Sequence, residues 1–204
     1  MDHLNEGATA RAATLRMVAS LNQAQLDFAP QAGTWSIAEV LDHLLLAEAL
    51  YREEIARLIE MKRAGQRPYL SRSFADINVS PLYLPDMVLP WLVMPLTIMN
   101  AFMPAFVRDL ATEYAVIPTR NPDRATPRAR RPAADLRADL LTSHAYMREL
   151  LSVNADLNFR EMVSEHPLTG ASNVPAILAF LARHERRHQT QIARLKAHPR
   201  FPRP

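Results

Sequence analysis

The residues with the clearest capacity for chemistry lie near the C-terminus, in the stretch "LARHERRHQTQIARL" at residues 181–195. His184 and His188 are four residues apart, so on a helix both imidazoles leave the same face, close enough to share a metal ion. With Glu185 between them they form H-E-x-x-H, which in zinc peptidases supplies two metal ligands and a general base. Histidines in a helical core are more often hydrogen-bonded packing residues, so the pair alone is weak support for a metal site.

A peptidase would need a third metal ligand downstream of this motif, and the sequence offers none. Such enzymes use a glutamate on a later helix or a histidine six residues after the second. Position 194 is an arginine, no aspartate or glutamate follows Glu185, and His198 lies ten residues after His188, past the predicted helix end. The sequence therefore disfavours a peptidase, and any third ligand must come from upstream.

A suitable upstream histidine lies on the helix predicted after "GTW". Ser36 and Glu39 form a capping box that starts this helix, because each side chain satisfies a free backbone N–H of the first turn. His43 then falls between Val40 and Ala47, on the stripe predicted to face the core. The candidate metal ligands are therefore His43, His184 and His188.

Two further residues have alternative interpretations. Glu185 is the candidate catalytic base, but Arg186 and Arg187 beside it favour an exposed helix residue. His144 lies on the inward face of a predicted helix and can serve as a fourth ligand or partner of the site. Packing or an interface is the favoured role for His144.

The hydrophobic periodicity predicts an all-α protein. Amphipathic patterns indicate helices over about residues 8–25, 36–63, 133–153 and 173–195. The last of these is expected to start near Ser172 or Asn173 as its N-cap. Four such helices bury their apolar stripes most simply as an antiparallel four-helix bundle, and 204 residues suit a single domain over 1–204. The absence of cysteine excludes thiolate ligands and disulfides. The charged N-terminus lacks the apolar segment of a signal peptide, which predicts a cytoplasmic protein.

A long insertion is predicted between the second and third helices, over residues 79–131. Residues 79–107 contain one charge, Asp86, and the 21 residues from 87 to 107 contain none, a length that can span a bilayer. Prolines at positions 90, 95 and 104 argue against a spanning helix, because each removes a backbone hydrogen bond that lipid cannot replace. We therefore expect a broken apolar arm that packs on the bundle or on a second subunit of a homodimer, with membrane contact as the alternative.

An arginine-rich segment follows the apolar arm. Residues 117–137 contain six arginines and two aspartates, an excess of four positive charges. Such a run can meet nucleic acid or anionic lipid. No aromatic residue interleaves the arginines and no binding motif surrounds them, so we favour a solvated, proline-broken loop and expect no nucleic-acid partner.

Two motifs resemble a known family. "TWSIAEVLDHL" resembles the W-S-x-x-E-x-x-x-H-L start of the second helix in the DinB/YfiT-like metalloenzymes, and residues 166–195 resemble their H-P-x-x-G turn and H-x-x-x-H-x-x-Q-I helix. The resemblance implies a four-helix bundle with His43, His184 and His188 as metal ligands, the same set that helical phase indicates. By the same comparison, His166 is expected to have a structural role in the turn. Trp35 directly precedes the cap at Ser36, a position from which we expect it to staple the helix entrance rather than stack on a substrate.

The resemblance also implies a chemistry. Three neutral imidazoles leave a divalent ion its full charge and at least one open position for water, a thiol or a carbonyl. Zinc and nickel both suit such ligands. The resemblance implies a metal-dependent enzyme of the thiol S-transferase or hydrolase type, acting on a small molecule such as a low-molecular-weight thiol. The alternative is a non-catalytic, metal-stabilised bundle that binds a protein partner or membrane surface through the apolar arm and the arginine-rich loop.

Overall fold

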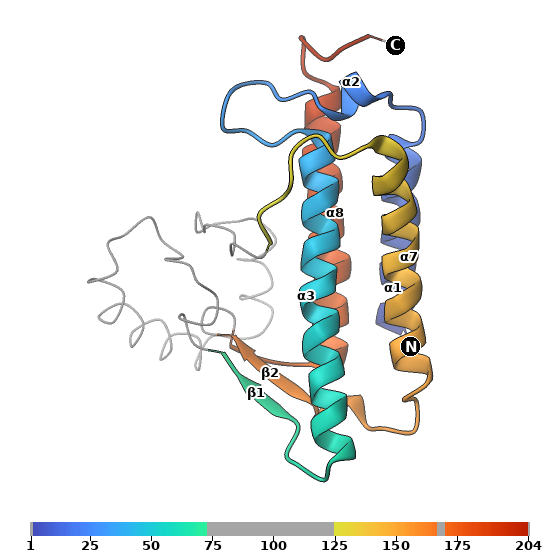
Figure 1. The fold of residues 1–204 in the computed structure, drawn as a ribbon, viewed down its shortest axis with the longest axis vertical. Coiled ribbons are helices and arrows are strands. Elements are labelled where there is room, and N and C mark those ends of the chain that lie inside the picture. The colour runs from blue at the N-terminus through green and yellow to red at the C-terminus, as the bar shows by residue number, and fades with distance from the viewer. Residues whose placement is uncertain (1, 73–124, 167–169, 204) are drawn as a thin grey trace, which may run out of the picture. The chain divides into compact units, whose positions relative to one another are not determined.

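The structure is a computed structural model, and it describes residues 2–72, 125–166 and 170–203. Most of the described residues are helical, with three short strands (Figure 1). In chain order the elements are α1 (Asp2–Val18), α2 (Gln23–Leu26), α3 (Ile37–Arg63), β1 (Tyr69–Ser71), α7 (Ala133–Ser152), the 3-10 helix η2 (Phe159–Glu161), β2 (Val163–His166), β3 (Gly170–Asn173) and α8 (Val174–Lys196).

The chain divides into two compact units. The first, which we call the bundle unit, comprises residues 1–52, 126–155 and 178–204. It holds α1, α2, α7, the first part of α3 and most of α8. The second, the sheet unit, comprises residues 53–125 and 156–177 and includes the three strands.

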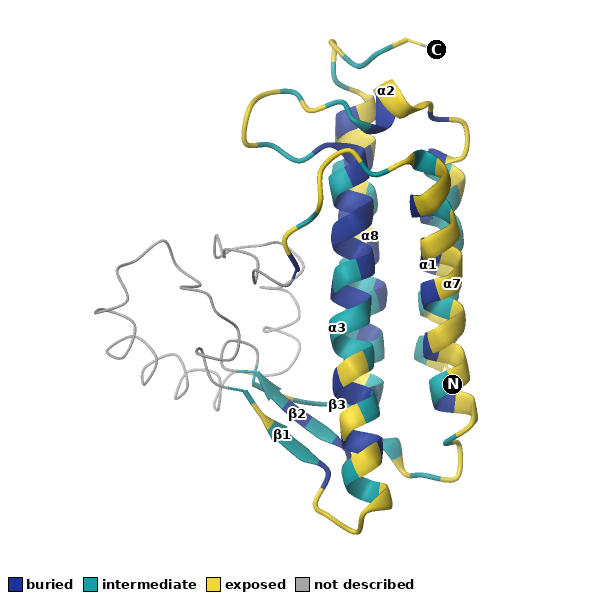
Figure 2. Cartoon of the chain, in the orientation of Figure 1, coloured by how far each residue is buried: buried dark blue, intermediate teal, exposed yellow. Residues whose placement is uncertain are grey.

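Apolar side chains from every helix of the bundle unit form one core. The core includes one fully buried residue from each long helix: Val18 of α1, Leu41 of α3, Leu140 of α7 and Ile192 of α8. On α7 the buried residues follow the predicted three- and four-residue steps. They are Leu136, Leu140, Ser143, Met147 and Leu151. Figure 2 shows how the buried residues run along α3 and α8.

The predicted capping residues start α3 and α8. Glu39 accepts a hydrogen bond from the backbone N–H of Ser36 (2.8 Å), and Ser36 Oγ accepts one from the backbone N–H of Glu39 (3.2 Å). Asn173 caps α8 by accepting from the backbone N–H of Ala176 (3.0 Å). Local hydrogen bonds of this kind are encoded within four residues, which is why the sequence predicts them.

The N-terminal helix differs from the prediction of a single helix over residues 8–25. α1 begins at Asp2 and ends at Val18, and a separate short helix, α2, follows. The break has a local cause. The side chain of Asn22 and that of Gln25 form a capping box, which starts a new helix rather than continuing the old one.

The sheet unit corrects the prediction of an all-α fold. β1 pairs with β2 in parallel, and β2 pairs with β3 in an antiparallel hairpin whose last pair is His166 with Gly170. β1 and β2 are separated by some ninety residues of sequence, and each strand has only three or four residues. Neither a strand period nor a helical period can be recognised over so short a stretch.

The apolar arm at residues 79–107 lies outside the described residues, as does most of the predicted insertion. Among the helices that the structure describes, none is long and apolar enough to cross a membrane.

Candidate metal centre

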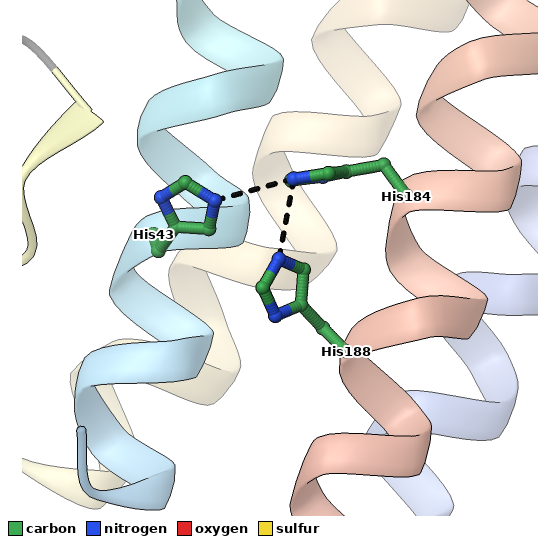
Figure 3. A group of neighbouring side chains, drawn as sticks. All are labelled: His43, His184 and His188. Carbon is green, nitrogen blue, oxygen red and sulfur yellow. Dashed lines mark hydrogen bonds between the residues drawn. The ribbon is translucent and has the colours of Figure 1, made fainter. Parts of the chain in front are cut away.

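His43 of α3 meets His184 and His188 of α8 inside the bundle unit (Figure 3). His184 Nε2 lies 3.2 Å from His43 Nε2 and 3.2 Å from His188 Nε2, and the three ligand nitrogens all lie within 4.8 Å of one another. His43 and His188 are only 4% and 6% exposed. The structure therefore brings together all three predicted ligands, on two helices far apart in sequence.

The spacing of these nitrogens matches a metal-binding cluster. A tetrahedral zinc site has metal–nitrogen distances of about 2.0–2.1 Å, so its ligand nitrogens lie about 3.3–3.4 Å apart. The two nitrogen pairs that share His184 Nε2, each at 3.2 Å, are close to this value. Among the described residues, this trio is the one group of three or more potential ligands that could hold an ion.

The protonation of the histidines favours a bound cation. Burial lowers the pKa of His188 to about 4, with the neighbouring His43 adding to the effect. Burial, followed by the nearby His188 and His43, likewise lowers the pKa of His184 well below its usual range. The rings of His184 and His188 are therefore neutral at physiological pH. A neutral imidazole has one ring nitrogen without a proton, and the lone pair of that nitrogen can bind a cation.

His188 has a hydrogen-bond partner on its other ring nitrogen. Its Nδ1 lies 2.8 Å from Oε1 of Gln191, one turn further along α8. An acceptor at this position places the ring proton on Nδ1 and leaves the lone pair on Nε2, as a metal ligand requires. Gln191 is a site residue that helical phase alone did not identify, although it lies within the matching H-x-x-x-H-x-x-Q-I motif.

Aromatic rings flank the three histidines. The ring centroid of Trp35 lies 4.9 Å from that of His43 and 6.5 Å from that of His188. Phe180 stacks on His184 with a centroid distance of 5.5 Å. Trp35 also packs against the apolar core, as expected of a residue at a helix entrance. These rings restrict the rotamers of the histidines and exclude water from part of their surroundings.

Glu185 is buried, which contradicts the interpretation of an exposed helix residue. Only 5% of its surface is exposed, and its Oε1 accepts a hydrogen bond from Arg11 Nε at 2.8 Å. Arg11 also donates to Glu48 Oε2 (2.9 Å) and to the carbonyl of Leu140 (2.7 Å). The arginines beside Glu185 in sequence point elsewhere on the helix surface, so they were a poor guide to its environment. The prediction that Glu185 is a catalytic base stays a prediction.

The ion-pair cluster of Arg11, Glu48 and Glu185 was not predicted. Burial by itself raises the pKa of Glu48, but the neighbouring His144 and Arg11 outweigh it and hold the carboxyl below its usual range. A signal for this cluster was present in the sequence. Arg11 shares a helical stripe with Leu15 and Val18, and Glu48 follows Leu44 at a four-residue step, so both charged residues lie on apolar faces.

His144 does not belong to the histidine cluster. Its Nδ1 lies 3.7 Å from Glu48 Oε1, and its buried Nε2 has no hydrogen-bond partner among the described residues. A cavity of about 30 Å³ adjoins it, lined also by Arg11, Glu185 and His184. His144 therefore packs beside the ion-pair cluster, in keeping with the favoured interpretation of a packing residue.

Part of the arginine-rich segment binds within the bundle unit. Asp42, which is fully buried next to His43, accepts hydrogen bonds from the backbone and side chain of Arg128 (2.7–3.1 Å) and from Arg131 (2.9 Å). Burial by itself raises the pKa of Asp42, but these hydrogen bonds outweigh it and lower the pKa. Arg137 donates to the carbonyls of Val18 and Leu21. These three arginines are therefore anchored in the fold rather than fully solvated.

The fold and the site together define a mainly helical protein with a buried three-histidine cluster suited to a cation. The family model of the DinB superfamily matches residues 7–192, and the chain belongs to this superfamily. Searches of curated proteins and of solved structures find no match.

Proposed function

We propose that the protein binds one divalent metal ion, zinc or nickel, through His43, His184 and His188, on an antiparallel four-helix bundle. The observation that carries the proposal is the convergence of three imidazoles, in which His184 Nε2 lies 3.2 Å from the Nε2 atoms of both His43 and His188. Imidazole ligands suit both metals, and three of them leave a position for water or substrate. When bound, the ion supplies Lewis acidity that activates a coordinated water or thiol.

We propose further that the protein is a metal-dependent enzyme of the thiol S-transferase or hydrolase type, acting on a small molecule in the cytoplasm as a homodimer. The roles of the chain's own residues follow from the geometry. The three histidines hold and orient the reaction centre, Trp35 and Phe180 exclude water beside it, and Gln191 holds a ring proton away from it. Membership of the DinB superfamily supports this class of function.

The role of Glu185 as a base is separable from its structural role. Its carboxylate binds the guanidinium of Arg11, and the bond at 2.8 Å must be broken or shared if the same carboxylate is to accept a proton from a substrate. A Glu185→Gln variant retains an acceptor for Arg11 but lacks a basic carboxylate. If Glu185 is the base, this variant keeps its metal and loses turnover.

Metal content of purified protein tests the proposed site. Protein prepared without chelator and without a histidine tag is expected to contain about one divalent ion per chain. The His43→Ala variant is expected to contain none. Elemental mass spectrometry measures the metal content of both. His3→Ala is the matched control, because the side chain of His3 is 45% exposed and contacts Glu6 rather than the cluster. Equal metal content in wild type and His43→Ala would show that the site is wrong.

Turnover assays then separate the enzyme from the non-catalytic bundle. Removal of metal is expected to abolish thiol transfer or hydrolysis, and addition of zinc or nickel is expected to restore it. A protein whose thermal stability falls on chelation, but which turns over neither thiol acceptors nor esters and amides, would instead be a metal-stabilised bundle.

A further inference from the structure

Gln191 and His188 form a hydrogen-bonded pair on one face of α8. The residues are three apart, so their side chains lie one above the other on the helix. His188 Nδ1 lies 2.8 Å from Gln191 Oε1, while Nε2 of the same ring lies 3.2 Å from His184 Nε2. One nitrogen of the His188 ring therefore faces the amide, and the other faces the histidine cluster.

The position of a single proton decides what this ring can do. A neutral imidazole carries its proton on either Nδ1 or Nε2, and the nitrogen without the proton is the one that can bind a cation. If the proton of His188 were on Nε2, it would point at His184 and fill the space where the ligand lone pairs converge. An amide oxygen at Nδ1 favours the other tautomer by about the energy of one buried hydrogen bond.

We propose that Gln191 is a positioning residue of the histidine cluster: it holds the proton of His188 on Nδ1 and fixes the plane of the ring, so that Nε2 presents its lone pair to the cluster. The consequence for metal affinity rests on the proposed function. The consequence for the tautomer does not, because it follows from the hydrogen bond between His188 and Gln191 alone.

Gln189 provides a matched control on the same helix. Its side-chain amide donates to the carbonyl of Ala10 (2.8 Å) and to Thr14 Oγ1 (3.1 Å), so it fastens α8 to α1. The same substitution at positions 189 and 191 removes one partly buried amide from α8 in each case. Only the change at 191 removes a partner of a ring nitrogen. Methionine is the replacement of choice, since it is close to glutamine in length and shape.

The first experiment measures the tautomer of His188 by nitrogen-15 NMR of the metal-free protein at alkaline pH. Wild type and Gln189→Met are expected to show the proton of His188 on Nδ1. Gln191→Met is expected to show it on Nε2 or distributed over both nitrogens. Gln191→Glu, which keeps an acceptor at the same place, is expected to restore the Nδ1 form. An unchanged Nδ1 tautomer in Gln191→Met would overturn the inference.

The second experiment measures zinc affinity by competition with a chromophoric chelator. Loss of an outer-shell partner of a ligating histidine lowers metal affinity by about 10–100-fold, and this is expected for Gln191→Met. Gln189→Met is expected to retain the wild-type affinity while lowering thermal stability, and Gln191→Glu to recover it. Equal zinc affinity in wild type and Gln191→Met would contradict the positioning role.

The two experiments distinguish the failure of this inference from failure of the proposed function. If wild type binds no zinc but its tautomer responds to Gln191→Met, the metal site is wrong and the proton-holding role of Gln191 stands. If wild type binds zinc and neither measurement responds to Gln191→Met, the metal site stands and Gln191 serves packing alone.

Discussion

Removal of Arg11 provides the most direct test of how the bundle unit tolerates charge in its interior. The Arg11→Met variant keeps the length of the side chain but removes hydrogen bonds to Glu48, Glu185 and the carbonyl of Leu140. The side chains of Arg11, Glu48 and Glu185 are only 6%, 6% and 7% exposed. The substitution therefore leaves two largely buried carboxylates without their cationic partner.

The expected cost follows from this geometry. Breaking a buried ion pair by removing one partner costs about 3–5 kcal/mol, because the remaining charge is stranded. Glu48 keeps a hydrogen bond from Ser143 Oγ at 3.0 Å, which offsets a small part of the loss. For a protein of this size each kcal/mol lowers the melting temperature by roughly 2–4 °C, so Arg11→Met is expected to melt about 6–20 °C lower.

The assay is urea unfolding followed by circular dichroism, on protein freed of metal so that ion binding does not contribute. Arg57→Met is the control, because Arg57 and Glu60 form an ion pair in which both side chains are about two-thirds exposed. Exposed pairs of this kind contribute about 0–1 kcal/mol. A triple variant, Arg11→Met with Glu48→Gln and Glu185→Gln, is expected to be more stable than Arg11→Met alone, since it strands no charge. A loss below about 1 kcal/mol in Arg11→Met would refute the reasoning.

Three further predictions concern pH, a buried carboxylate and the core. Burial, with a smaller effect of Arg72, lowers the pKa of His166 to about 4. Burial also lowers the pKa of His188 to about 4. Between about pH 6.5 and 4 the unfolded chain therefore binds more protons than the folded one. The free energy of unfolding of metal-free protein is expected to fall as the pH drops from 6.5 to 4. It is expected to fall further below pH 4, because the lowered pKa values of Asp42 and Glu48 make the unfolded chain bind more protons there as well. A pH series of urea titrations checks this, and a flat profile would contradict it. Asp42→Asn should lower stability by roughly 1–3 kcal/mol in the same assay, because asparagine cannot accept from both arginines as a charged partner; an unchanged midpoint would show that the contacts contribute nothing. Leu140 is fully buried, so Leu140→Ala should lower the free energy of unfolding by about 2–5 kcal/mol. Leu141 is 61% exposed, so Leu141→Ala should change the free energy of unfolding little. Equal losses of stability in the two variants would show that the core is misassigned.

The histidine cluster could be predicted from sequence because its information is local. The period of a helix places His184 and His188 on one face, and the same period places His43 on the inward stripe of α3. The caps at Ser36 and Asn173 are local for the same reason. Each of these predictions needs only the chemistry of residues within a few positions of one another.

Apart from the break between α1 and α2, which has a local cause, the features that were missed depend on contacts between distant segments. The parallel pairing of β1 with β2 aligns Tyr69 with Val163, and no pattern within either strand predicts this pairing. The burial of Glu185 depends on Arg11, which is 174 residues away. Its sequence neighbours, Arg186 and Arg187, suggested a solvated face because adjacent residues on a helix point in different directions.

The hydrogen bonds at Asp42 have a consequence for engineering. Residues 128 and 131 are held to α3 within the bundle unit, immediately before α7 begins. The point at which the chain enters α7 is thus secured by two arginines that bind a buried carboxylate of α3. A redesign of the segment between β1 and α7 must therefore keep Arg128 and Arg131, or Asp42 loses its partners beside His43.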